Sequence, residues 1–241
     1  MTIVNHVHMG WYSDGYHSPH QIWTELETAG IRMAAVSSTS TCAELYHNIM
    51  TEFCQLIAYA GKSRVKPLLW ITPKMLMERW PIKTLLRSKI EWHGIKMHFI
   101  SHPQLAKNNR LVDQALDVAR SLGKLPVLFH TGEWESCHAA AFSDLISENP
   151  DLQFVLAHGR PIDETISIMK QFDNVWVDTA FMPTESVAKL KQERLTPRVM
   201  FGSDAPINRL FFKEVSTQEY LKGKIEEIRS VDSKILTNTI Y

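Results

Sequence analysis

The chain lacks a net charge, because its 26 Lys and Arg residues balance its 26 Asp and Glu residues. Proteins that bind nucleic acid or other polyanions concentrate basic residues, so this balance argues against that function and favours a small-molecule substrate. The sequence also lacks an apolar run of the ~20 residues that cross a membrane, and its first residues do not resemble a secretory signal. These absences predict a cytoplasmic protein that contacts neither nucleic acid nor membrane.

Cysteine is scarce as well. The three cysteines, Cys42, Cys54 and Cys137, form no CxxC pair, which argues against a disulfide framework and against a thiolate zinc site. We expect buried free thiols in a reducing compartment. The glycine-rich motifs of dinucleotide and phosphate binding are missing, and so is the GxSxG motif of serine hydrolases, so the sequence offers no basis for those chemistries.

What the sequence does contain is a repeated alternation of two kinds of segment. Short apolar segments rich in strand-forming residues recur at about the length of one βα unit, with amphipathic stretches between them. Of these stretches, Ala43–Ala60 and Asn109–Leu122 place their apolar residues on one helical face. The eight predicted strands are Ile3–His8, Met33–Ser38, Val65–Thr72, Gly94–Phe99, Pro126–Thr131, Gln153–His158, Val175–Ala180 and Val199–Asp204.

Strands this apolar are expected in a parallel sheet that is covered on both faces. Eight strands alternating with helices within ~250 residues are typical of a (β/α)8 TIM barrel. We therefore predict an α/β fold with a single TIM-barrel domain over residues 1–241, because no linker or shift in composition divides the chain. An open, doubly wound sheet is the structural alternative.

The sequence contains 11 histidines, which is more than we expect for its length. Four of them and one aspartate lie at the ends of predicted strands. These residues fall at the carboxyl ends of predicted strands one, five, six and eight: His6, His8, His130, His158 and Asp204. Strand alternation points His6 and His8 to the same side. Barrel enzymes build their active sites at this face, and these side chains suit zinc, iron or manganese. The placement predicts a metal site, with structural histidines and a helix-capping Asp204 as the alternative.

Five short segments resemble motifs of the amidohydrolase superfamily, and specifically of its amidohydrolase-2 branch of metal-dependent hydrolases and decarboxylases. The resemblance runs through the whole chain in the right order, and the eighth-strand segment is the most specific. One departure is Val4, which stands where the family usually has aspartate. The segments are Asn5–Gly10, Gly94–His98, Pro126–Gly132, Leu156–Gly159 and Phe201–Pro206.

The resemblance implies a ligand set and a division of roles. Zinc would be the metal, with iron or manganese as alternatives, and a second metal would use His158 or a carbamate on Lys96. Asp204 would take a proton from the metal-activated water, and His158 would hydrogen-bond that water or polarise the substrate oxygen. The implied ligands of the one divalent metal are His6, His8, His130 and Asp204.

These features predict a metal-dependent hydrolase that cleaves a C–O or C–N bond of a small molecule. Non-oxidative decarboxylation of an aromatic or unsaturated acid is the first alternative, and Arg160 would favour it as a carboxylate clamp. A TatD-type deoxyribonuclease would call for an acidic residue where Lys96 stands. An inactive binding module is the last alternative, and a homodimer is left open. The candidate substrate-binding residues are Arg160, Lys96, His98 and Trp11, and Asp178 is a candidate to orient a ligand histidine.

Overall fold

The computed structural model describes residues 1–241, and its strands form one sheet. The order in the sheet is β2-β1-β3-β4-β5-β6-β7-β8-β9. The only antiparallel pairing joins β1 to β2 in a hairpin, and every other pairing is parallel. The strands are β1 (Thr2–Tyr12), β2 (Gly15–His17), β3 (Ile31–Ser38), β4 (Val65–Trp70), β5 (Gly94–Met97), β6 (Val127–His130), β7 (Phe154–Ala157), β8 (Val175–Asp178) and β9 (Val199–Met200).

The sheet closes on itself between β1 and the segment that follows β9. The Asn5 amide donates to the carbonyl of Phe201 at 2.7 Å, and the His8 amide donates to that of Ala205 at 2.7 Å. Val7 and Ala205 also form a parallel bridge. The eight parallel strands therefore complete a barrel, which confirms the predicted TIM-barrel fold, with β2 as an added hairpin strand.

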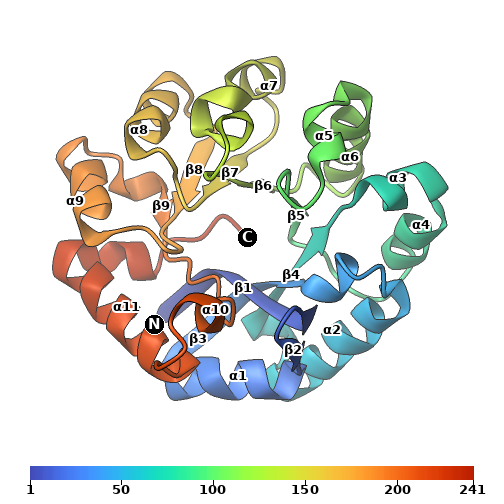
Figure 1. Ribbon diagram of the computed structural model, residues 1–241, viewed down its shortest axis with the longest axis horizontal. Coiled ribbons are helices and arrows are strands. Elements are labelled where there is room, and N and C mark those ends of the chain that lie inside the picture. The colour runs from blue at the N-terminus through green and yellow to red at the C-terminus, as the bar shows by residue number, and fades with distance from the viewer.

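Helices surround the barrel, as Figure 1 shows. Local signals start several of them: Ser18 caps α1 just before Pro19, and Ser216 forms a capping box with Glu219 at α11. No helix is long and apolar enough to cross a membrane. The helices are α1 (Pro19–Thr28), α2 (Tyr46–Ala60), α3 (Pro73–Glu78), α4 (Trp80–Leu86), α5 (Pro103–Ala106), α6 (Asn109–Ser121), α7 (Ser143–Glu148), α8 (Ile162–Gln171), α9 (Thr184–Gln192), α10 (Asn208–Phe211) and α11 (Thr217–Asp232).

The core has two parts. The larger part packs the apolar faces of the helices against the outside of the barrel. A smaller cluster includes Leu68, Leu128 and Met200, and the carboxyl-terminal Ile240 and Tyr241 pack against it. Figure 1 shows the carboxyl terminus at the centre of the ring of strands, so the last residues help to fill the barrel.

The bounds of all eight predicted strands differ from the observed ones, and the largest differences are at the ends of the first and the last. The first strand extends to Tyr12, because it continues into the β1–β2 hairpin. The last strand ends at Met200 instead of Asp204, because its pairing with β8 ends there, and Asp204 itself has a positive φ of 57°. The chain therefore turns where Asp204 enters the site. The three cysteines are free thiols, as predicted, but the expected burial holds only for Cys137, since Cys54 is exposed and Cys42 partly buried.

Candidate metal centre

The alternating geometry of β1 brings His6 and His8 together at the carboxyl end of the barrel. Both side chains are buried, and their Nε2 atoms are 3.2 Å apart. His6 directs its Nδ1 to a carboxylate oxygen of Asp178 at 3.0 Å. Because a carboxylate only accepts, His6 carries its proton on Nδ1 and presents a lone pair on Nε2. This is the tautomer that a metal-binding histidine needs.

His8 is arranged in a similar way. Its Nδ1 lies 3.0 Å from the hydroxyl of Ser37 on β3, so its Nε2 also faces the interior of the site. Burial and the nearby Lys96 charge together lower the pKa of His8 to about 3, against the opposing effect of Asp204. His8 is therefore neutral at physiological pH, which is the form that binds metals.

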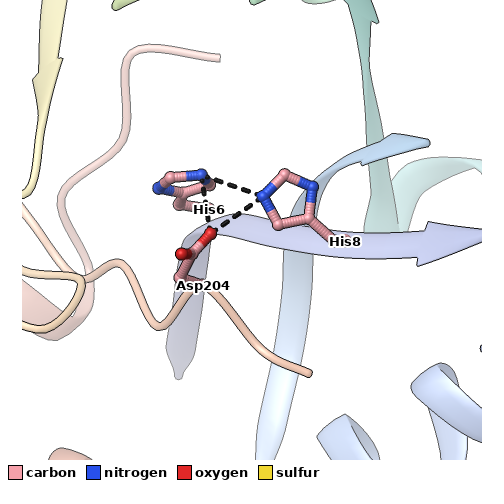
Figure 2. Close-up of side chains that lie close together, drawn as sticks. All are labelled: His6, His8 and Asp204. Atoms are coloured by element: carbon pink, nitrogen blue, oxygen red, sulfur yellow. Dashed lines mark hydrogen bonds and ion pairs between the residues drawn. The ribbon is translucent and has the colours of Figure 1, made fainter. Parts of the chain in front are cut away.

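Asp204 completes a group of three potential ligands. Its Oδ1 lies 3.1 Å from Nε2 of His6 and 2.8 Å from Nε2 of His8 (Figure 2). Burial opposes ionisation of Asp204, but the two histidines outweigh it and hold the pKa of this carboxyl well below its usual range. The three ligand atoms lie within 4.8 Å of one another. Two imidazole nitrogens and a carboxylate oxygen suit zinc, iron or manganese, so these residues fit a divalent metal.

Lys96, on β5, lies against the same atoms. Its Nζ is 2.7 Å from Nε2 of His6 and 2.9 Å from Nε2 of His8, and it sits 4.5 Å above the ring of Trp70. Burial lowers the pKa of Lys96 to about 8, while the charges of Asp204 and Asp178 oppose that shift. The amino group donates to the lone pair on Nε2 of His6, so a metal that binds to this nitrogen must replace that hydrogen bond.

Asp178, at the end of β8, contacts the ring nitrogen of His6 that does not face the other candidate ligands. Its Oδ2 accepts from His6, and its Oδ1 accepts from the backbone amides of His158 and Ala180 at 3.2 and 2.9 Å. A Cβ atom at Gly202 would lie 2.7 Å from the carboxyl carbon of Asp178, so only glycine leaves room for this carboxylate. Asp178 was predicted to orient a ligand histidine, and in the structure it contacts His6, one of the candidate ligands.

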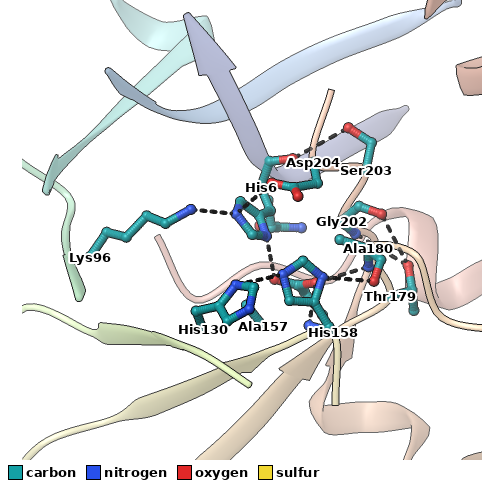
Figure 3. A network of polar contacts seen from close by, with 12 residues as sticks. His6, Lys96, His130, Ala157, His158, Thr179, Ala180, Gly202, Ser203 and Asp204 are labelled. Atoms are coloured by element: carbon teal, nitrogen blue, oxygen red, sulfur yellow. Dashed lines mark hydrogen bonds and ion pairs between the residues drawn. The ribbon is translucent and has the colours of Figure 1, made fainter. Parts of the chain in front are cut away.

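His130 and His158 form a second histidine pair, close to His6 (Figure 3). Nδ1 of His158 lies 3.0 Å from the carbonyl of Ala180, and its Nε2 lies 3.1 Å from Nδ1 of His130. Nε2 of His130 contacts the carboxylate of Glu133 at 2.7 Å. Both nitrogens of His130 are thus engaged outside the three-residue group, and its role as fourth ligand stays a prediction. Burial lowers the pKa of His158 to about 3, so its ring is neutral.

A pocket of about 600 Å³ opens over these residues. The candidates from the sequence that line it are His8, Lys96, His98, His130, His158, Arg160 and Asp204. Arg160 donates to Glu133 at 2.8 Å, so its charge is already partly paired.

The structure places Trp11 outside the lining, against Tyr16, with ring centroids 5.2 Å apart. Tyr12, one residue further along β1 and so on the side of His8, lines the pocket instead.

An apolar wall is the part of the pocket that sequence reasoning missed. Phe211 and Phe212 are largely exposed, and the ring of Phe181 contacts both of them and His158. Glu133, which follows His130 by three residues, also lines the pocket. The missed apolar and aromatic lining residues are Trp70, Ile100, Phe181, Ile207, Phe211 and Phe212.

Comparison with known proteins agrees with this architecture. A family model described as Amidohydrolase matches residues 78–221, which is more than half of the chain. The chain belongs to this family, the amidohydrolase-2 branch of the amidohydrolase superfamily. No curated protein matches the chain.

Several solved structures share the fold. A probable 2-pyrone-4,6-dicarboxylic acid hydrolase from Acinetobacter baumannii, with citric acid bound, is 11% identical with a TM-score of 0.67, over 98% of this chain and 95% of that one. IDCase from Metarhizium anisopliae in apo form is 12% identical with a TM-score of 0.65, over 98% and 94%. 4-Oxalomesaconate hydratase from Rhodopseudomonas palustris is 13% identical with a TM-score of 0.58, over 98% and 94%. At these identities the similarity establishes the fold.

Proposed function

We propose that the protein is a metal-dependent hydrolase that cleaves a C–O or C–N bond of a small molecule. The observation that carries the proposal is the convergence of His6, His8 and Asp204, with the tautomer of His6 set by Asp178. The pocket above these residues has room for a small molecule. A bound divalent ion, with zinc as the first choice, supplies a Lewis acid that polarises a carbonyl oxygen and makes water a better nucleophile near neutral pH.

Asp204 is placed to move a proton in this reaction. Its pKa is held well below the usual range, so the side chain is a carboxylate at neutral pH. Oδ1 faces the two histidines, which leaves Oδ2 to accept a proton from the attacking water and pass it to the leaving group.

His158 has its Nδ1 proton committed to the carbonyl of Ala180. Its Nε2 is therefore an acceptor that now faces Nδ1 of His130 at 3.1 Å, so a water that hydrogen-bonds there would have to replace this contact.

Decarboxylation on the same site is the second candidate, and one observation favours it. The buried amino group of Lys96 lies beside the three ligands and offers a cation to a substrate carboxylate. The salt bridge between Arg160 and Glu133 weakens the case for Arg160 as the carboxylate clamp.

We expect hydrolysis to be lost when the protein is treated with a chelator and restored when zinc, iron(II) or manganese(II) is added back. The assay would use a panel of lactones, esters, amides and aromatic acids, with product and carbon dioxide measured separately. Hydrolysis that is equal before and after verified metal removal would contradict the proposal. Metal-dependent release of carbon dioxide without hydrolysis would select the decarboxylase.

A further inference from the structure

His98, in the segment after β5, is held by stacking against two other rings. One face of its ring stacks on Trp70, with centroids 5.5 Å apart and an interplanar angle of 17°. His130 also stacks on the ring, with centroids 4.0 Å apart and an angle of 30°. The side chain contributes to the pocket lining. These contacts leave the ring little freedom to rotate.

One nitrogen of His98 is also committed. The backbone amide of Ser101 donates to Nδ1 of His98 at 3.1 Å. Because a backbone amide can only donate, Nδ1 carries a lone pair, and the proton of the neutral ring resides on Nε2. A ring whose Nδ1 accepts a hydrogen bond is neutral, with its N–H group at Nε2.

The Nε2–H group of His98 makes no hydrogen bond within the protein, whereas both nitrogens of His6, His130 and His158 have protein partners. His98 lines the pocket and is only partly buried, so this donor is open to a molecule that binds there. In the same pocket, Lys96 supplies a second donor, while Phe181 and Phe212 supply apolar surface. The free donor and this apolar wall match a planar or apolar group that carries an acceptor oxygen.

We infer that His98 is a substrate-binding residue that donates Nε2–H to a carbonyl or carboxylate oxygen of the substrate. The inference rests on the proposed function in that this pocket is the substrate site, but the tautomer is a property of the protein alone. A neutral donor of fixed orientation selects for an oxygen at one position and excludes a group that would itself donate there.

The tautomer can be measured directly by 15N NMR of the protein labelled at histidine, with the His98→Gln spectrum used to assign the His98 signals. The expected result at neutral pH is a protonated Nε2 and an unprotonated Nδ1 on His98. A protonated Nδ1, or a ring that is charged at both nitrogens, would overturn the inference.

The hydrogen bond to a ligand can be tested with benzoate, which carries an acceptor carboxylate on a planar apolar ring. We expect saturable binding that shifts the His98 Nε2 signal. The His98→Phe variant keeps an aromatic ring for the stack but loses the donor, so it should weaken binding about 10–100-fold. His98→Gln, which restores an amide donor, should recover most of the affinity. His47→Phe is the matched control, because His47 is exposed on α2 and outside the pocket.

Absence of saturable benzoate binding, or equal affinity in the wild type and in His98→Phe, would overturn the inference. These readouts use binding, so they stand apart from hydrolysis. If benzoate binding depends on His98 but no substrate is hydrolysed in a metal-dependent way, the proposed function fails while the assignment of His98 holds.

Discussion

Asparagine in place of Asp204 should lower kcat of the proposed hydrolysis by about 10²–10⁴-fold, the range for loss of a general acid–base group. The amide has nearly the shape of the carboxylate, so the barrel should stay folded. The variant nevertheless loses the proton acceptor at Oδ2 and the negative charge that faces His6 and His8 at Oδ1. The measurement is kcat and KM with saturating metal, together with thermal unfolding.

Asp163→Asn is the matched control for this prediction. Asp163 is an exposed carboxylate on α8, paired only with Lys189 at the surface, and the same change there should leave kcat within about two-fold, since surface ion pairs contribute little. If Asp204→Asn binds metal, folds normally and keeps kcat near the wild-type value, Asp204 is not the proton carrier.

Asparagine in place of Asp178 should weaken metal binding by about 10–100-fold, the range for loss of a group that orients a ligand histidine. Asp178 accepts three hydrogen bonds, from His6 on one oxygen and from the amides of His158 and Ala180 on the other. Asparagine has only one acceptor oxygen, so it cannot serve both sets of donors. Either His6 loses the partner that fixes its tautomer, or two backbone amides are left facing an NH2 group.

The affinity for zinc would be measured in competition with a chromophoric chelator. Asp163→Asn again serves as control, and a denaturant unfolding curve separates loss of metal affinity from loss of the fold. Zinc affinity in Asp178→Asn equal to that of the wild type would show that His6 does not depend on Asp178 for its orientation.

The sequence predicted the barrel well because the signal for it is local. Each apolar strand segment lies where the structure has a strand, and parallel strands in a barrel bring their carboxyl ends to one face. For that reason, His6, His8 and Asp204 were expected together although they are far apart in the chain. Strand alternation alone placed the two histidines on the same side.

Other features depend on tertiary contacts that spacing does not encode. His130 lies at the predicted strand end, but its nitrogens contact His158 and Glu133. Which residues its nitrogens contact depends on the orientations of side chains on neighbouring segments. Trp11 was expected in the pocket because it follows the first strand. The structure continues β1 to Tyr12, so alternation carries Trp11 to the other side.

The apolar wall of the pocket could not be predicted from sequence spacing either. Phe211 is the last residue of the short helix α10 and Phe212 follows it, and no periodicity in the sequence points them toward the site. Phe181 reaches the pocket from the loop after β8 and packs against them. Loops at the carboxyl face of a barrel take their positions from packing against one another, so their contribution emerges only in three dimensions.

The central claim is that His6, His8 and Asp204 hold a divalent metal. Its most direct test is the metal content of the protein purified without chelator, by elemental analysis, compared with that of a His6→Ala/His8→Ala double variant shown to be folded. The account predicts about one zinc, iron or manganese ion per wild-type chain and none in the variant. A wild-type protein that neither carries metal nor retains added zinc would contradict it, as would a variant with the same metal content as the wild type.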